Sequence, residues 1–445
     1  MSGLPESPQH KPLRILCLHG YSGRNLGDAA IVEGMKKVIE KRFGPCEWKM
    51  LSVEHGKDYR FDNNVSYFRN LGLSVIPALF PSPQFQRREG KIPSLSLQII
   101  RFFRGWVYSR WCILMARIFK SKARYFIGPV ARSTIDAMVE ADIVMSKGGG
   151  YLYSEGMRGE LFLRRMLSPY LLSKALNKPT IAFGVTVGPI SGRRSRKLAR
   201  RVLKKLDRLY VREELSMALL KELDADHNAK VIPDIAFGLA STHKPASPQE
   251  GVINIGVTAR NWNFIGSEDP QVRKQNYINA LARALDILAT QNNARIHLIA
   301  HSTVDNIKED DSRFFSLILE RMKRVDSVKI MEVPDSVQAL QDIYAKMHLV
   351  IGARMHSLIL AAAMRVPMVG IACEKPKTHG IMRMLGQEEM VINVEDLRAE
   401  ELVGKANHAL QKREEYRRKI DANILKIIAD LDEAANDIER FFLER

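Results

Sequence analysis

Short apolar runs alternate with segments of helical periodicity along most of this chain. Residues 13–18, 141–145 and 180–187 form apolar runs with little polar alternation, which is typical of parallel strands buried on both faces. Helical patterns follow elsewhere, for example over residues 29–41 and 159–176. The alternation predicts an α/β fold in which helices cover both faces of a parallel sheet.

The pattern stops at a Pro- and Ser-rich stretch, residues 241–250, and then restarts. A chain of 445 residues is also longer than one ordinary hydrophobic core. We therefore predict two Rossmann-like domains, over residues 1–240 and 251–395, and a helical extension over residues 396–445. The first domain carries a basic aromatic insertion near residues 80–130.

The helical extension has one apolar stripe. Its members recur at helical spacing and are Ile420, Ile424, Ile427, Leu431 and Ile438. Such a stripe predicts a helix that buries one face. We expect this helix to cross back onto the first domain, and a dimer-forming helix is the alternative.

The stretch from Gly352 to Ser357 has the pattern of a ligand site. It lies between an apolar run at 347–351 and a small-residue helix at 358–363. Ligands of open α/β sheets bind outside the carboxyl ends of strands, and helix N-termini attract anions. Arg354 supplies a fork of donors, and His356 adds a proton donor of a residue type whose pKa can lie near neutrality. We predict an anion site at Arg354, His356 and Ser357; a capped helix start with a solvated arginine is the alternative.

Other candidate ligand contacts lie at predicted strand ends or helix starts. They are Asn25 and Asp28, the glycines Gly148, Gly149 and Gly150, Arg212, and the lysines Lys375 and Lys377. Two sheets facing each other would bring these residues to one central cleft, with many cations and few acids. Such a cleft suits a small, strongly anionic ligand. Asp28 could instead be a helix N-cap, and Asp28 or Asp234 could serve as a base or as a structural cap.

Several enzyme classes lack support in the sequence. The predicted cleft has no pair of carboxylates typical of glycosidases, and the chain has no G-x-S-x-G nucleophile elbow. The four cysteines are far apart and form no CxxC, so we expect no structural zinc site and a reducing compartment. Residues 1–11 lack the apolar core of a signal peptide, and we expect a cytoplasmic protein.

The formal net charge of +18 concerns partners more than fold. Residues 92–126 interleave Trp and Phe with arginines and contain no acid. This pattern predicts an interfacial helix on an anionic membrane, with a core-packed insertion as the alternative. The basic helix at 193–208 could also touch phosphates, although a solvated face is more common. No motif for reading nucleic acid accompanies the charge, and the oligomeric state stays open.

The ordered motifs of the chain resemble the polysaccharide pyruvyl transferase family. They are Asn25-Leu26-Gly27-Asp28-Ala29-Ala30, Gly148-Gly149-Gly150, Gly184-Val185-Thr186-Val187-Gly188-Pro189, Val211-Arg212-Glu213, Pro233-Asp234-Ile235-Ala236-Phe237 and Arg354-Met355-His356-Ser357. The resemblance covers roughly residues 14–386. The sequence departs from the family pattern in its basic aromatic insertion and at Cys373-Glu374-Lys375, so the roles of Lys375 and Lys377 stay open.

The resemblance implies a two-domain fold like that of GT-B glycosyltransferases, with the acceptor on the first domain. It also implies transfer of pyruvate from phosphoenolpyruvate onto two hydroxyls of a sugar, forming a cyclic ketal. Arg212, Arg354 and His356 would bind phosphoenolpyruvate, with no metal and no further cofactor expected. The acceptor would be a cell-surface polysaccharide or its lipid-linked precursor. The alternatives are a nucleotide-sugar glycosyltransferase, with Glu374 holding the donor, and a non-catalytic membrane-peripheral protein of the same fold.

Overall fold

The computed structural model describes residues 11–80, 82, 86–87, 93–241, 251–264, 266–304 and 310–445. By internal contacts the chain divides into two compact units. Unit 1 comprises Met1–Tyr21, Lys36–Ile232 and Ala434–Arg445, and unit 2 comprises Ser22–Met35 and Pro233–Glu433. The expected domains differ from these units in two segments. Ser22–Met35 belongs to unit 2, and Ala434–Arg445 belongs to unit 1. Most of the predicted linker, from residue 242 to residue 250, lies outside the described residues.

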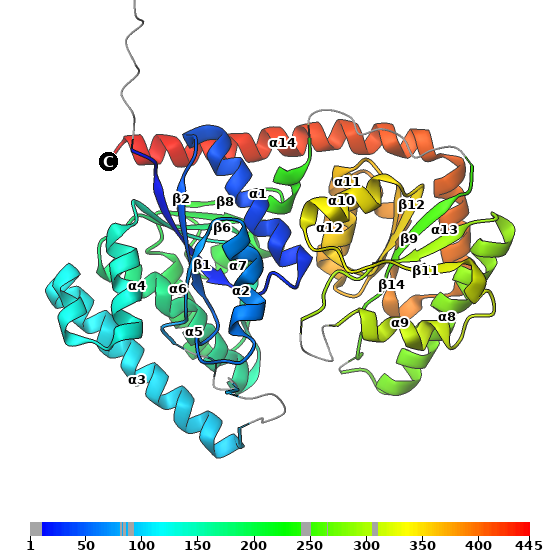
Figure 1. Ribbon diagram of the computed structural model, residues 1–445. Coiled ribbons are helices and arrows are strands. Elements are labelled where there is room, and N and C mark those ends of the chain that lie inside the picture. The colour runs from blue at the N-terminus through cyan, green and yellow to red at the C-terminus, as the bar shows by residue number, and fades with distance from the viewer. Residues whose placement is uncertain are drawn as a thin grey trace, which may run out of the picture. The chain divides into compact units, whose positions relative to one another are not determined.

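Unit 1 is built on a parallel sheet (Figure 1). Its strands are β1 (Arg14–Gly20), β2 (Glu47–Ser52), β3 (Ser74–Ile76), β4 (Ile143–Ser146), β5 (Gly149–Ser154), β6 (Thr180–Ile190), β7 (Arg208–Val211) and β8 (Ala229–Val231). Their order is β3-β2-β1-β4-β6-β7-β8, and β5 pairs with β6 beside this path. The apolar side chains of β1 and β4 are buried, as their unalternating sequences predict.

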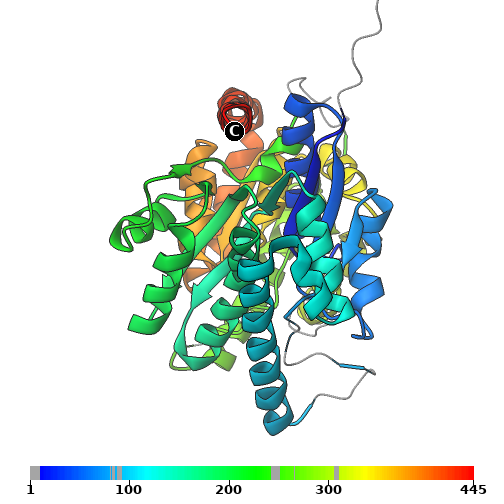
Figure 2. The same cartoon turned by 90° about the vertical axis from the view of Figure 1, so that its left-hand side faces the viewer.

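The helices of unit 1 follow the predicted pattern with shifted ends. They are α1 (Leu26–Phe43, from Lys36 onward in this unit), α2 (Phe61–Asn70), α3 (Leu95–Phe119), the 3₁₀ segment η1 (Lys120–Phe126), α4 (Pro129–Glu140), α5 (Gly156–Ala175), α6 (Arg193–Leu203) and α7 (Glu214–Glu222). The basic helix expected to reach residue 208 ends at Leu203, because β7 starts at Arg208. Figure 2 shows α3 on the outside of its unit, with its N-terminal end extending past the neighbouring helices.

Unit 2 has a second, wholly parallel sheet. Its strands are β9 (Asn254–Thr258), β10 (Arg295–Leu298), β11 (Val328–Ile330), β12 (Leu349–Gly352), β13 (Met368–Ala372) and β14 (Val391–Asn393), in the order β11-β10-β9-β12-β13-β14. The helices are α8 (Pro270–Gln291), α9 (Ser312–Leu319), α10 (Val337–Ala345), α11 (Met355–Ala363), α12 (Lys375–Met384) and α13 (Ala399–Gln411), with a 3₁₀ turn η2 (Ile235–Leu239). Successive strands are added toward one edge of the sheet from β9 to β11 and toward the other edge from β12 to β14. A topological switch point therefore lies between β9 and β12.

The last helix, α14 (Arg413–Leu443), joins the two units. Its predicted apolar stripe is buried. Its final turns belong to unit 1, where the Tyr210 hydroxyl donates a hydrogen bond to Asp437 and the Lys230 ammonium lies 3.0 Å from the same carboxylate. The prediction that this helix returns to the first domain is therefore confirmed. Within the described residues, no helix is long and apolar enough to span a membrane.

Candidate functional site

The predicted anion site lies at the switch point of unit 2. β9 and β12 pair in parallel, with Gly352 opposite Thr258, so both strands end at the same edge of the sheet. α11 begins at Met355, directly after Arg354. The strand, turn and helix predicted around Arg354 are present. The carboxyl end of a strand at a switch point is where open α/β sheets bind ligands.

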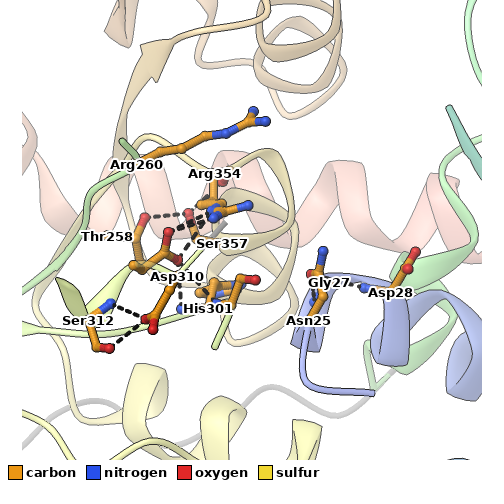
Figure 3. A network of polar contacts seen from close by, with 12 residues as sticks. Asn25, Gly27, Asp28, Thr258, Arg260, His301, Asp310, Ser312, Arg354 and Ser357 are labelled. Atoms are coloured by element: carbon orange, nitrogen blue, oxygen red, sulfur yellow. Dashed lines mark hydrogen bonds and ion pairs between the residues drawn. The ribbon is translucent and has the colours of Figure 1, made fainter. Parts of the chain in front are cut away.

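Arg354 is held by a buried carboxylate. Its Nε lies 3.1 Å from each carboxylate oxygen of Asp311, and its Nη2 lies 2.5 Å from Oδ1. Asp311 is 1% exposed and also accepts hydrogen bonds from the backbone amides of His301 and Ser302. The Arg354 guanidinium is therefore fixed in orientation by a charge-assisted contact. Figure 3 shows one end of the guanidinium directed away from these contacts.

Buried polar side chains form hydrogen bonds next to this arginine. The Ser357 hydroxyl is fully buried, donates to the Arg354 carbonyl at 2.6 Å and lies 2.8 Å from the Thr258 hydroxyl. The His301 imidazole is hydrogen-bonded to the Tyr344 hydroxyl. Burial, with help from the nearby positive charge of Arg354, holds the pKa of His301 well below its usual value, so this histidine is neutral. Ser357 thus has a supporting contact, and its predicted part in substrate binding stays a prediction.

His356 lies against the first turn of α1. A Cβ built on Gly27 would be 2.6 Å from His356 Nδ1, so only glycine leaves room for the ring in this position. On its other side, His356 Nε2 is 3.8 Å from the carboxylate of Asp234. Asp234 is 1% exposed and caps η2 by accepting a hydrogen bond from the Ala236 amide. The imidazole is therefore placed between a helix start and a buried acid.

The N-terminus of α1 is capped by Asn25. The Asn25 Oδ1 atom accepts hydrogen bonds from the amides of Gly27 and Asp28, at 3.1 and 3.4 Å. The Leu26 amide donates to the His301 carbonyl at 2.9 Å. The suggestion that Asp28 is the N-cap is wrong, because α1 starts at Leu26 and Asp28 lies in its first turn. These contacts place the Asn25–Asp28 segment in unit 2, beside the end of β10.

A second ionic cluster forms around Glu374. Its carboxylate accepts from Arg260 at 2.9 Å and from Lys377 at 2.6 Å. Burial alone would raise the pKa of Glu374, but Lys377 and Arg260 together lower it to about 2. Two cations thus share one carboxylate, and the cluster has a net positive charge. In Figure 3 Arg260 and Arg354 extend to the same side of the sheet edge. Lys375 lies 3.3 Å from Glu395.

The expectation of a site with few acids is wrong for unit 2. The predicted cations Arg354, Lys375 and Lys377 each face a carboxylate. A buried arginine without a counter-charge would be very costly, and Asp311 removes that cost for Arg354. The partner acid comes from a segment 43 residues earlier in the chain, so local sequence gave no sign of it.

The remaining predicted contacts, Arg212 and the three glycines, belong to unit 1. Arg212 is 8% exposed, and its Nε donates to the Thr186 hydroxyl at 2.9 Å. It precedes α7, which starts at Glu214. Gly148, Gly149 and Gly150 follow the end of β4, as predicted, and Gly149 and Gly150 start a further strand, β5, which pairs with β6. Gly149 has a φ of +138°, a conformation that favours glycine.

Comparison with known proteins agrees with the motifs. The model of the family described as "Polysaccharide pyruvyl transferase" matches residues 25–375. The chain belongs to this polysaccharide pyruvyl transferase family. It is also 25% identical over 428 residues to the amylovoran biosynthesis protein AmsJ of Erwinia amylovora, covering 92% of this chain and 94% of that protein.

The fold of this pyruvyl transferase family member resembles solved structures of a glycosyltransferase and of a UDP-GlcNAc 2-epimerase. A glycosyltransferase from Rickettsia africae superposes with a TM-score of 0.55 at 13% identity, covering 98% of this chain and 100% of that one. A UDP-GlcNAc 2-epimerase from Neisseria meningitidis gives a TM-score of 0.55 at 11% identity, covering 97% and 100%. At such identities the likeness concerns the fold alone, and it confirms two Rossmann-like domains of the GT-B type.

The sequence analysis did not identify three residues of this candidate site, which are Asp311, His301 and Arg260. Asp311 and His301 received no role, and Arg260 was not considered. His301 and Arg260 follow apolar strands β10 and β9 within a few residues, which is a signal that could have found them. Asp311 follows no strand directly. Its role depends on the tertiary contact with Arg354.

Proposed function

We propose that this protein transfers pyruvate from phosphoenolpyruvate onto two hydroxyls of a sugar, forming a cyclic ketal. The acceptor is part of a cell-surface polysaccharide or its lipid-linked precursor. Family membership supports a transferase of polysaccharide biosynthesis. The observation that carries the finer proposal is the pairing of an oriented arginine, Arg354, with an imidazole, His356, held beside a buried acid at the switch point of unit 2.

Phosphoenolpyruvate has a phosphate and a carboxylate on one small carbon frame. An arginine whose orientation is fixed by Asp311 can form charge-assisted hydrogen bonds with such a group without losing that orientation. The excess positive charge of Arg260 and Lys377 over Glu374 would stabilise the charge that develops on departing phosphate. In this proposal, Arg354 orients the donor and Arg260 adds charge near it.

His356 acts as the proton donor in the proposed reaction. Its proton goes to the methylene carbon of phosphoenolpyruvate, and the adjacent carbon accepts a sugar hydroxyl, forming the first C–O bond. The bond from that carbon to the phosphate oxygen then breaks and inorganic phosphate leaves. A second hydroxyl forms the second C–O bond, and its proton is taken up by the departing phosphate. Asp234, 3.8 Å from His356 Nε2, stabilises the protonated imidazole and orients it.

The assignment of the base stays a proposal with one favoured candidate. After protonating carbon, the neutral His356 can accept the proton of an attacking hydroxyl, so that one residue serves both steps. Asp28 is not required for this, because in the proposal His356 both donates and accepts the proton. Arg212, in unit 1, is retained as a proposed donor contact on the strength of the family motif alone.

The glycosyltransferase alternative has less support. It needs a carboxylate that holds the ribose or donor sugar, and Glu374 was its candidate. Glu374 is already the acceptor for both Arg260 and Lys377, and its lowered pKa reflects those contacts. Calorimetry with UDP and with phosphoenolpyruvate separates the two proposals, because a pyruvyl transferase of this kind binds the latter.

Variants test the roles of the site. We expect His356→Ala and Arg354→Ala to lose at least ~100-fold in the rate of acceptor-dependent phosphate release. Matched controls are His379→Ala and Arg383→Ala, whose side chains lie on α12 and pair with Glu388. Thermal unfolding of each variant shows whether the fold is retained. Full activity in both site variants would refute the assignment.

A further inference from the structure

The solvent-facing side of α3 has a continuous apolar stripe. Its members are Ile100, Phe103, Val107, Trp111, Leu114 and Ile118, each at least 45% exposed. They follow one another at spacings of three or four residues, so they fall on one helix face over about five turns. Exposed apolar residues are common singly, but a contiguous stripe of this length marks an interaction surface.

The opposite face of α3 anchors the helix to unit 1. Cys112, Met115 and Ala116 are buried. The Gly128 amide donates to the Tyr108 hydroxyl at 2.8 Å, which ties the helix to the segment after η1. The exposed stripe is therefore distinct from the face that packs on the core of unit 1. It is a second apolar face on a helix whose first is already packed.

Cations flank the stripe on both sides. On a helix of 100° per residue, Arg104 lies about 60° to one side of the stripe, and Arg110 and Arg117 about 60–80° to the other. Among the described residues, no carboxylate pairs with any of the three. The sequence contains no Asp or Glu between Lys91 and Arg132.

This arrangement fits an anionic lipid surface. Apolar side chains enter the acyl boundary, while arginines on either side reach the phosphate level with their stems along the apolar region. A second copy of the chain fits less well, because a symmetric contact through this face would bring the same unpaired arginines together.

The second basic helix differs in this respect. On α6, Arg196 pairs with Glu222, and Arg200 and Lys204 share Asp224. These three cations are thus offset by two neighbouring acids, as on an ordinary solvated face. Residues 193–208 do not belong to the surface inferred here, and α6 supplies a matched control.

We propose that the exposed stripe of α3, with Arg104, Arg110 and Arg117, docks the protein on an anionic membrane surface. The helix lies in the plane of the interface and does not cross it. The docking does not depend on the proposed reaction, but it would bring a pyruvyl transferase to acceptors linked to lipid.

The test measures binding of the full chain to vesicles. We expect sedimentation with vesicles containing phosphatidylglycerol, weaker binding to pure phosphatidylcholine, and a decrease with salt. Ile100→Ser/Phe103→Ser/Ile118→Ser should lower binding at least ~10-fold, while the exposed apolar set Val272→Ser/Ile330→Ser/Val333→Ser should not. Arg104→Gln/Arg110→Gln/Arg117→Gln should lower it roughly 100-fold, while Arg196→Gln/Arg200→Gln/Lys204→Gln should not.

A spectroscopic readout places the helix in the interface. Brominated lipids should quench tryptophan fluorescence, and Trp111→Phe should remove most of that quenching, because Trp111 belongs to the stripe. Absence of binding to anionic vesicles would overturn the proposal, as would equal loss in the α3 variants and their controls. A dimer that the stripe variant converts to monomer, without vesicle binding, would instead assign this face to a second copy.

Discussion

Replacing Gly27 by alanine tests how His356 is positioned. The added methyl group would lie 2.6 Å from His356 Nδ1 and 2.9 Å from Cγ. An ordinary van der Waals contact begins near 3.4 Å, so the ring must move by about 0.8 Å or the first turn of α1 must shift. Either movement changes the contact of the imidazole with Asp234, which is 3.8 Å in the native arrangement.

The size of the effect follows from this displacement. A shift of about 1 Å in a reacting group can lower a rate about 100-fold, and overpacking of this kind costs about 1–3 kcal/mol of stability. We therefore expect Gly27→Ala to reduce kcat of phosphate release by one to two orders of magnitude. The effect on KM should be smaller, because the three atoms nearest to the added methyl group all belong to His356 and none to Arg354 or Arg260.

A double-variant cycle isolates the contact. In a His356→Ala background the ring contacts are gone and only the His356 Cβ contact at 3.0 Å remains, so Gly27→Ala should cost less stability there than in the wild-type protein. Chemical denaturation measures all four free energies of unfolding. Gly404→Ala is the matched control, because nothing lies within 4 Å of its added methyl group; it should stabilise α13 by about 0.5–1 kcal/mol. Equal costs of Gly27→Ala in both backgrounds would refute the reasoning.

Two further changes probe the charges of each unit. Asp311→Asn should destabilise the protein by about 3 kcal/mol and abolish activity, because Arg354 loses its buried counter-charge; denaturant unfolding and the phosphate assay measure both. Asp437→Asn should cost about 1–3 kcal/mol at pH 7. Burial raises the pKa of Asp437, but Tyr210 and Lys230 bring it below its usual value. Its stabilisation is present above about pH 4 and is lost as the pH falls through the lowered pKa, so the variant's deficit should vanish in acid.

The alternation of apolar runs and helical segments was sufficient to predict two parallel sheets. Buried strands such as β1, β4 and β12 read as apolar throughout, because helices cover both of their faces. The turn after β12 was predicted for the same reason, and with it the positions of Arg354 and His356. Helix and strand ends were less predictable, as at Leu203, where the same basic pattern continues past the end of α6.

Contacts between residues far apart in the chain explain the features that could not be predicted from the sequence. Asn25 pairs with Ser302 and the Leu26 amide donates to the His301 carbonyl, so both residues lie in unit 2. No local sequence pattern predicts these contacts. The role of Asp311 depends on its tertiary contact with Arg354. Gly149 was predicted to follow a strand and to contact a ligand, and the structure shows that it also starts the strand β5, with a positive φ that favours glycine.

Phosphate release from phosphoenolpyruvate tests the central claim most directly. The purified protein is incubated with a pool of free and lipid-linked oligosaccharides from bacterial surface glycans, and phosphate is measured alongside product mass. We expect phosphate release that requires acceptor, together with an acceptor whose mass rises by one pyruvate ketal, and loss of both in His356→Ala. Transfer of a sugar from a nucleotide donor, with no binding of phosphoenolpyruvate in calorimetry, would contradict the claim.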